Sequence, residues 1–74
     1  MTQLKPLPFR EVKRKLEAVG FQEVSSKGSH VKFARVTPLG TYTAIVPRHR
    51  EVPVGTLRSI LKQAGIGPDE FERL

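Results

Sequence analysis

The sequence predicts an α+β fold with the element order α-β-β-β-α, in which helices pack on one face of a three-stranded antiparallel meander. Two observations lead to this prediction. Apolar residues recur at helical spacing near both ends of the chain, and short segments bounded by glycine and proline turns occupy its middle. Because 74 residues suffice for one small hydrophobic core, residues 1–74 are expected to form a single domain.

The first predicted helix begins at Pro8, because proline suits the first helical position. Its apolar residues recur at helical spacing, and they are Phe9, Val12, Leu16 and Val19. The helix should end before Gly20, since glycine can adopt the left-handed conformation that closes a helix. Phe21 can then fold back onto Leu16.

Three strands are predicted next, over residues 21–26, 29–36 and 42–46. Lys27-Gly28 is the expected turn between the first two strands. Residues 37–40, with proline early and glycine late, are the expected turn between the second and the third.

The alternation of side chains along a strand assigns faces to the second strand. Val31 and Phe33 are its large apolar residues and should point toward the helices, so His30 and Lys32 should point to the opposite, open face. The third strand leaves two alternative inner sets, which are Thr43 with Ile45, or Tyr42 with Ala44 and Val46.

A second helix is predicted to begin near residue 55, with an apolar stripe formed by Leu57, Ile60, Leu61 and Ala64. Gly65 closes it as Gly20 closes the first, and Ile66 can contact Leu61. A short third helix starts at Pro68. The last two helices resemble a helix-turn-helix motif, but the third is too short and too acidic to lie in a DNA groove, so core packing is the preferred interpretation.

Charge indicates the kind of partner. The chain has 13 Lys and Arg against 7 Asp and Glu, a net charge of +6, and residues 1–50 hold the whole excess. A basic body favours a polyanion, with nucleic acid the leading candidate. On the first helix, Lys13, Arg14 and Lys15 are interpreted as a solvated face, with an ion pair between Glu11 and Lys15.

Composition also limits the location and the chemistry. The chain has no cysteine, which excludes disulfides, thiolate metal sites and a cysteine nucleophile. No segment resembles a signal peptide, and the longest aliphatic run, residues 44–46, is too short to cross a membrane. We therefore expect a cytoplasmic protein without a membrane partner.

The segment from Lys27 to Lys32 carries the strongest candidate for chemistry. Gly28 and Ser29 would let backbone N–H groups approach a phosphate, and His30 follows them at the start of the second strand. Neighbouring cations disfavour the imidazolium form, so a neutral His30 is available to accept a proton. Such a group could deprotonate a ribose 2′-hydroxyl for attack on the adjacent phosphate, without a metal or another cofactor. The alternative is an ordinary solvated histidine.

A second basic cluster, Arg48-His49-Arg50, follows the third strand. Its arginines could hold phosphate, and His49 could protonate the leaving 5′-oxygen if the cluster lies near His30. The sequence leaves open whether the two lie at the same end of the sheet, and a solvated basic loop is the alternative. Two histidines 19 residues apart, without cysteine, fall short of a zinc site, so no metal is expected.

Four blocks of the sequence, LEAVGF, KGSHVKF, VPRH and GTLRSILKQAGI, occur in the order and spacing typical of HicA toxins of bacterial toxin–antitoxin pairs. From about Pro8 to Leu74 the chain resembles this family. The resemblance implies a double-stranded-RNA-binding-domain-like fold, an mRNA interferase activity and a HicB-like antitoxin that covers the active face. It also implies that His30 is the essential histidine. The chain departs from the common pattern at Val31 and Pro53, where polar residues occur in other members.

Three functions follow as hypotheses. The first is a metal-independent endoribonuclease toxin with His30 as its catalytic residue and Lys27, Gly28, Ser29, Lys32, Arg48, His49 and Arg50 as RNA contacts. The second is an RNA-binding module of the same fold that does not cleave. The third is a protein-interaction domain whose basic face binds an acidic partner. The expected free form is a monomer.

Overall fold

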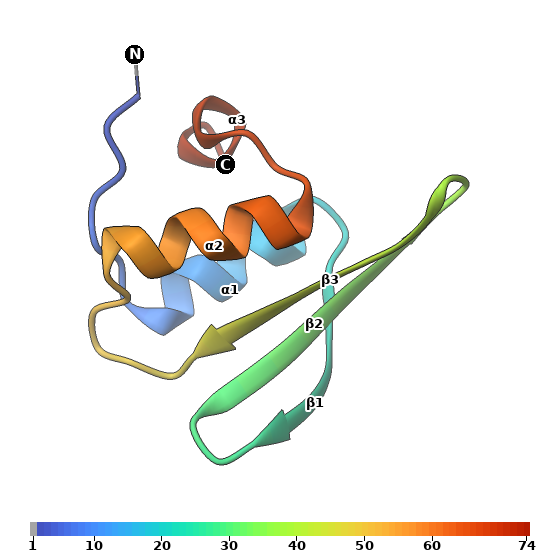
Figure 1. Ribbon diagram of the computed structural model, residues 1–74, viewed down its shortest axis with the longest axis horizontal. Coiled ribbons are helices and arrows are strands. Elements are labelled where there is room, and N and C mark those ends of the chain that lie inside the picture. Colours follow the sequence, from blue (N-terminus) through green and yellow to red (C-terminus); the bar gives the residue numbers. More distant parts are fainter. Residues whose placement is uncertain (1) are drawn as a thin grey trace.

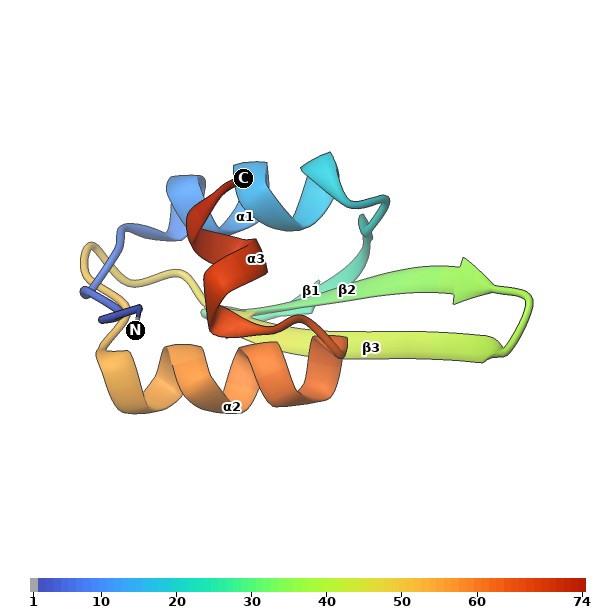
Figure 2. The ribbon, with the colours of Figure 1, turned by 90° about the horizontal axis from the view of Figure 1, so that it is seen from above.

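The structure, a computed structural model, describes residues 2–74, and its elements follow the predicted order. They are α1 (Phe9–Ala18), β1 (Gln22–Lys27), β2 (His30–Thr37), β3 (Gly40–Pro47), α2 (Val54–Ala64) and α3 (Pro68–Glu72). The strands form one antiparallel sheet in the order β1-β2-β3, so the meander is confirmed. Helices α1 and α2 lie side by side on one face of this sheet (Figures 1 and 2), which is the arrangement of the double-stranded-RNA-binding-domain-like fold.

Both long helices end as their sequences predict. Gly20 has a φ of 98°, and the Phe21 N–H donates to the Leu16 carbonyl at 3.1 Å. At the end of α2, Gly65 has a φ of 70°, and the next N–H along the chain donates to the Leu61 carbonyl at 3.0 Å. The start of α1 differs by one residue, because Pro8 has the extended conformation of a cap (ψ 153°) and the helix begins after it.

The turn of the first hairpin lies one residue later in the chain than expected. Lys27 pairs with His30, so the turn consists of Gly28 and Ser29. Gly28 has a φ of 59° and no other residue of this turn has a positive φ, which is the pattern of a type II′ hairpin turn. The second turn lies at residues 37–40 as predicted, and β3 runs on to include Pro47.

Proline is tolerated at the end of β3 because of the register. Arg48 donates its N–H to the Ser29 carbonyl at 2.6 Å, and β-ladder bonds alternate between neighbouring pairs. In the preceding pair, Pro47 with His30, the residue on β3 therefore donates no N–H group to β2, and proline can occupy that position.

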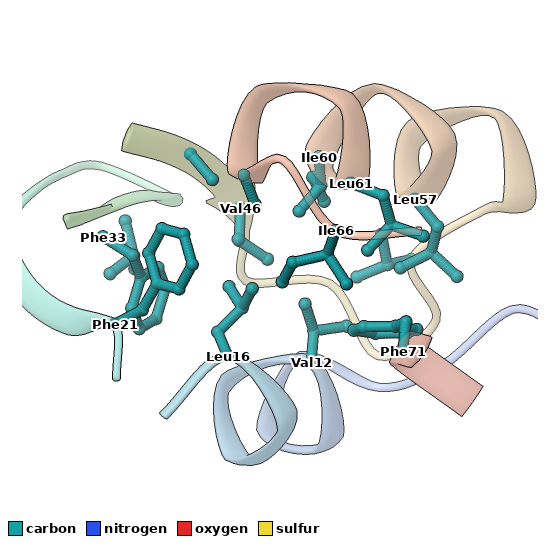
Figure 3. Packing of buried hydrophobic residues seen from close by; sticks show 14 residues of the cluster. Val12, Leu16, Phe21, Phe33, Val46, Leu57, Ile60, Leu61, Ile66 and Phe71 are labelled. Atoms are coloured by element: carbon teal, nitrogen blue, oxygen red, sulfur yellow. The ribbon is translucent and has the colours of Figure 1, made fainter. Parts of the chain in front are cut away.

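A single hydrophobic cluster lies between the sheet and the helices (Figure 3). Val31 and Phe33 are fully buried in it, as the alternation predicted, and β3 resolves its ambiguity by burying Ala44 and Val46. Ile45 is consequently on the open face, with 47% of its surface exposed. Beyond the helices the β2–β3 hairpin continues as a projection (Figures 1 and 2), whose residue Val36 is 81% exposed.

The interpretation of Lys15 as a solvated residue was wrong. Lys15 is buried, with 9% of its surface exposed, and its Nζ donates to the main-chain oxygens of Phe71, Glu72 and Leu74 at 3.0, 3.4 and 3.3 Å. Glu11 instead pairs with Arg14, three residues away, at 3.0 Å. Position 15 lies beside the apolar stripe of α1, and α3 presents carbonyl groups to it there.

Candidate nucleic-acid interface

The open face of the sheet carries a small grid of exposed side chains at the end where β2 begins. Lys27 and His30 are directly paired across β1 and β2, and Ser25, Lys32 and Ile45 form the adjacent row across all three strands. His30 and Lys32 lie two residues apart on one strand, so they share this face at a spacing of about 7 Å. All five side chains are exposed.

These rows line a depression of about 660 Å³ that is open to solvent. Its lining residues are Ser25, Ser26, Lys27, Gly28, Ser29, His30, Lys32 and Ile45. Five of the predicted site residues, from the segment 27–32, are thus brought together in one place. The lining includes two lysines and no acidic residue, so the depression is suited to an anion.

The turn beside His30 is held in place by the backbone. The Ser29 carbonyl accepts the Arg48 N–H, which joins the β1–β2 turn to the start of the loop after β3. A β-carbon built at Gly28 would meet no heavy atom within 4 Å, so the outer side of the turn is open space. A ligand can therefore approach this backbone closely.

The same bond answers the question that the sequence left open, because it places Arg48-His49-Arg50 at the same end of the sheet as His30. The side chains do not join the depression, however. The Arg48 guanidinium lies 3.8 Å from Glu23 and 5.9 Å from the centre of the Phe9 ring, toward helix α1. His49 and Arg50 are exposed on the loop, and neither lines the depression.

This loop is anchored rather than free. The His49 carbonyl accepts the Phe9 N–H at 3.1 Å, and Leu7 and Val52 form an isolated antiparallel bridge. Val52 is fully buried, although nothing in its sequence neighbourhood indicates a core position. The basic cluster therefore has a fixed backbone with exposed side chains.

The acidic residue that faces Arg48, Glu23, points away from the open face. Glu23 pairs across the sheet with Phe33, an inward position, and binds Lys13 of α1 at 3.1 Å. Its second oxygen faces Arg48. The carboxylate is thus neutralised on the helix side, and the charge of Lys27 and Lys32 on the open face has no acidic partner within the depression.

Sequence reasoning missed three members of the depression, which are Ser25, Ser26 and Ile45. The register could have found Ile45, since it lies opposite Lys32, but only after the inner face of β3 was known. Ser25 lies opposite Lys32 because the turn consists of Gly28 and Ser29, so that Lys27 pairs with His30. The turn expected at Lys27-Gly28 would have given a different register.

A larger depression of about 1040 Å³ lies elsewhere, between the N-terminal segment and α3. It includes Lys5, Lys15 and Arg58 but shares no residue with the open-face site. The ammonium group of Lys15 already donates to three main-chain oxygens, so this depression offers less free charge than its composition suggests.

Two further observations concern residues 2–74. No three His, Asp or Glu side chains of this range come together as a group that could hold a metal ion. None of the helices within it has the length and apolar character that crossing a bilayer requires.

With this geometry established, comparison with known proteins gives one match. The family described as HicA toxin of bacterial toxin-antitoxin matches residues 9–66, from the start of α1 to just past α2. This chain belongs to the HicA family. No match was found among curated proteins. HicA proteins are toxins that pair with an antitoxin, and family members are generally mRNA-cleaving ribonucleases.

Proposed function

We propose that this HicA chain is an endoribonuclease, an mRNA interferase that cleaves RNA by metal-independent acid–base chemistry centred on His30. The observation that carries the proposal is the position of His30 on the open sheet face, in a solvent-accessible depression whose charged neighbours are lysines. A ribose and its phosphate can reach this imidazole without any movement of the helices. The reaction needs a base and positive charge, and both are at hand.

In the proposed mechanism the neutral imidazole of His30 takes the proton of a ribose 2′-hydroxyl. The 2′-oxygen then forms a bond to the adjacent phosphorus as the bond from phosphorus to the 5′-oxygen breaks. The ammonium groups of Lys27 and Lys32 stabilise the charge that develops on the phosphoryl oxygens. The 5′-oxygen takes a proton from water or from a neighbouring acid, and the products are a 2′,3′-cyclic phosphate and a 5′-hydroxyl.

The second cluster has a supporting part in this proposal. Arg50 and His49 are exposed at the same end of the sheet as His30, which supports a role in holding RNA phosphates next to the reacting one. The charge of Arg48 is partly neutralised, because its guanidinium lies 3.8 Å from the Glu23 carboxylate. We propose phosphate binding for all three, and a HicB-like antitoxin that inhibits by covering the open face.

One assay separates the three hypotheses. The purified protein is incubated in EDTA with an RNA that is cut at a defined position and with the same RNA carrying a single 2′-deoxyribose there. Cyclic phosphate ends from the first RNA, and none from the second, are the result expected of the nuclease. Binding of both RNAs without cleavage would select the RNA-binding module, and the absence of both binding and cleavage would select the protein-interaction domain.

Lysine substitutions test the charge in the depression. Lys32→Ala should weaken RNA binding and reduce the dependence of affinity on salt, because one phosphate contact is lost. Lys62→Ala, on the exposed side of α2, is the matched control and should leave both unchanged. Equal behaviour of the two variants would contradict the assignment of the open face.

A further inference from the structure

The depression beside His30 has one apolar wall that the proposed chemistry does not use. Ile45 is 47% exposed and lines the depression on the β3 side, next to Lys32. An aliphatic side chain has no function in proton transfer or in charge stabilisation. Exposed β-branched residues are common on sheets, so its exposure alone indicates nothing. Its position relative to His30 is more informative.

Ile45 and Lys32 are direct partners in the β2–β3 ladder. The Ile45 N–H points away from β2, because it donates to Gln63 Oε1 at 3.1 Å. The pair therefore lacks ladder hydrogen bonds, and side chains in such pairs lie closest, with the Cα atoms about 4.5 Å apart. His30 is the diagonal neighbour of Ile45, at about 7–8 Å. The imidazole, the ammonium group and the apolar wall thus line adjacent parts of one depression.

The wall is also rigid. Ile45 lies within the β2–β3 ladder, and at the outer edge of the sheet its backbone N–H donates to the Gln63 side-chain oxygen of α2. A β-branched side chain in a strand has few rotamers to lose, so it can contact a flat ligand at small entropic cost. The depression of about 660 Å³ also lies within the range of about 300–1,000 Å³ typical of small-ligand pockets.

The geometry of the reaction determines which form of RNA can contact Ile45. Attack of a 2′-oxygen in line with the leaving 5′-oxygen requires the nucleotide to leave the regular helical geometry. In an A-form duplex the bases are stacked and paired inside the helix, and the backbone is what the protein meets. In a single strand, an unstacked base can rest against a side chain while its ribose approaches the base catalyst.

We propose that Ile45 is a contact for the nucleobase next to the scissile phosphate, and that the substrate is accordingly single-stranded RNA. The inference rests on the proposed nuclease function and narrows its substrate class. Lys27 and Lys32 bind the phosphates and Ile45 supports the base. His30 is a near neighbour of all three, as the partner of Lys27, two residues from Lys32 on β2 and diagonal to Ile45. An aliphatic contact has no hydrogen bonds with which to identify a base, so it selects for an unpaired nucleotide with weak preference among the four.

The test uses two matched threonine variants. Ile45→Thr shortens the apolar wall. Val36→Thr makes the same kind of change at a residue that is 81% exposed and lies near the end of β2, six residues along the strand from His30. Both variants keep a β-branched side chain, and thermal melts check that both fold. For a single-stranded RNA, kcat/KM should fall about three- to tenfold for Ile45→Thr. Val36→Thr should match the wild type.

Two substrates complete the design. The wild type should cleave the single strand at least about tenfold faster than the same segment annealed to its complement, since the duplex must first unpair at the cleavage site. When the RNA is abasic beside the scissile phosphate, the loss caused by Ile45→Thr should disappear, because there is no base to contact. This second result distinguishes a base contact from a general disturbance of the site.

The outcomes separate the inference from the function on which it rests. Equal cleavage of single strand and duplex, or equal activity of Ile45→Thr and Val36→Thr, overturns the base contact and leaves the nuclease in place. If the wild type cleaves neither RNA, the proposed function fails. The base contact is then decided by the affinities of the two variants for normal and abasic single strands, where equal losses for both RNAs would overturn it.

Discussion

The buried ammonium group of Lys15 permits a sharp test of what holds α3 in place. Lys15 is 91% buried, and its Nζ donates to the oxygens of Phe71, Glu72 and Leu74 while lying 5.0 Å from the centre of the Phe71 ring. Lys15→Met keeps the length of the side chain and removes the donor. Hydrogen bonds from a charged donor contribute about 1.5–3 kcal/mol, and the contact with the ring adds about 0.5–1 kcal/mol.

Part of this contribution is offset, because burying an ammonium group costs free energy and water can reach two of the three oxygens once the lysine is gone. The expected net loss is about 2 kcal/mol of unfolding free energy. For a domain of this size that is a fall in Tm of about 8–16 °C. Lys13→Met, two residues earlier on α1, removes one exposed ion pair with Glu23 and should cost less than about 1 kcal/mol.

The assay is urea and thermal unfolding of both variants, followed by circular dichroism. If Lys15→Met were as stable as Lys13→Met, the ammonium group would be solvated in solution, and its assignment as a clamp on α3 would be refuted.

Three other substitutions test the fold. Gly65→Ala should destabilise the fold by about 2 kcal/mol, because a left-handed φ of 70° disfavours alanine and its β-carbon would lie 2.8 Å from Tyr42 Cε2. Gly55→Ala should instead stabilise the fold by about 0.5–1 kcal/mol, because a β-carbon there meets nothing within 4 Å. Urea unfolding midpoints that shift in the same direction for both variants would contradict this packing. Arg14 lowers the pKa of Glu11 below its usual 4.5, first through their hydrogen bond, so the ion pair stabilises the fold above about pH 4.5 and this contribution is lost as the pH falls. Unfolding of Glu11→Gln and wild type, measured against pH, should therefore converge in acid, and a difference that grows in acid would reverse the sign of this linkage.

Much of the fold could be predicted because helix ends and strand faces depend on residues close together in the sequence. Gly20 and Gly65 end the two helices with the backbone bonds that a left-handed glycine allows, and these need only residues within one turn. The exposure of His30 likewise followed from one fact, that Val31 and Phe33 must be buried. The alternation of side chains along β2 then assigned the other residues of the strand to the inner or the open face.

What could not be predicted depends on partners distant in sequence. Lys15 is buried because oxygens more than 55 residues away need a donor, and helical periodicity contains no such information. The placement of Arg48 near His30 depends on its backbone bond to Ser29, and the orientation of its side chain depends on Glu23. The bulge in β1, which places Glu23 rather than Val24 opposite Phe33, is another such case.

The most direct test of the central claim is the rate of RNA cleavage by His30→Ala, measured in EDTA together with RNA affinity and Tm. His30 is exposed and lines the depression, so its removal should change the unfolding free energy by no more than about 0.5 kcal/mol. Cleavage should fall by at least about 100-fold, the lower end of what a general base contributes, while affinity for RNA is retained. Cleavage at the wild-type rate by a folded His30→Ala protein would contradict the claim that this imidazole is the base.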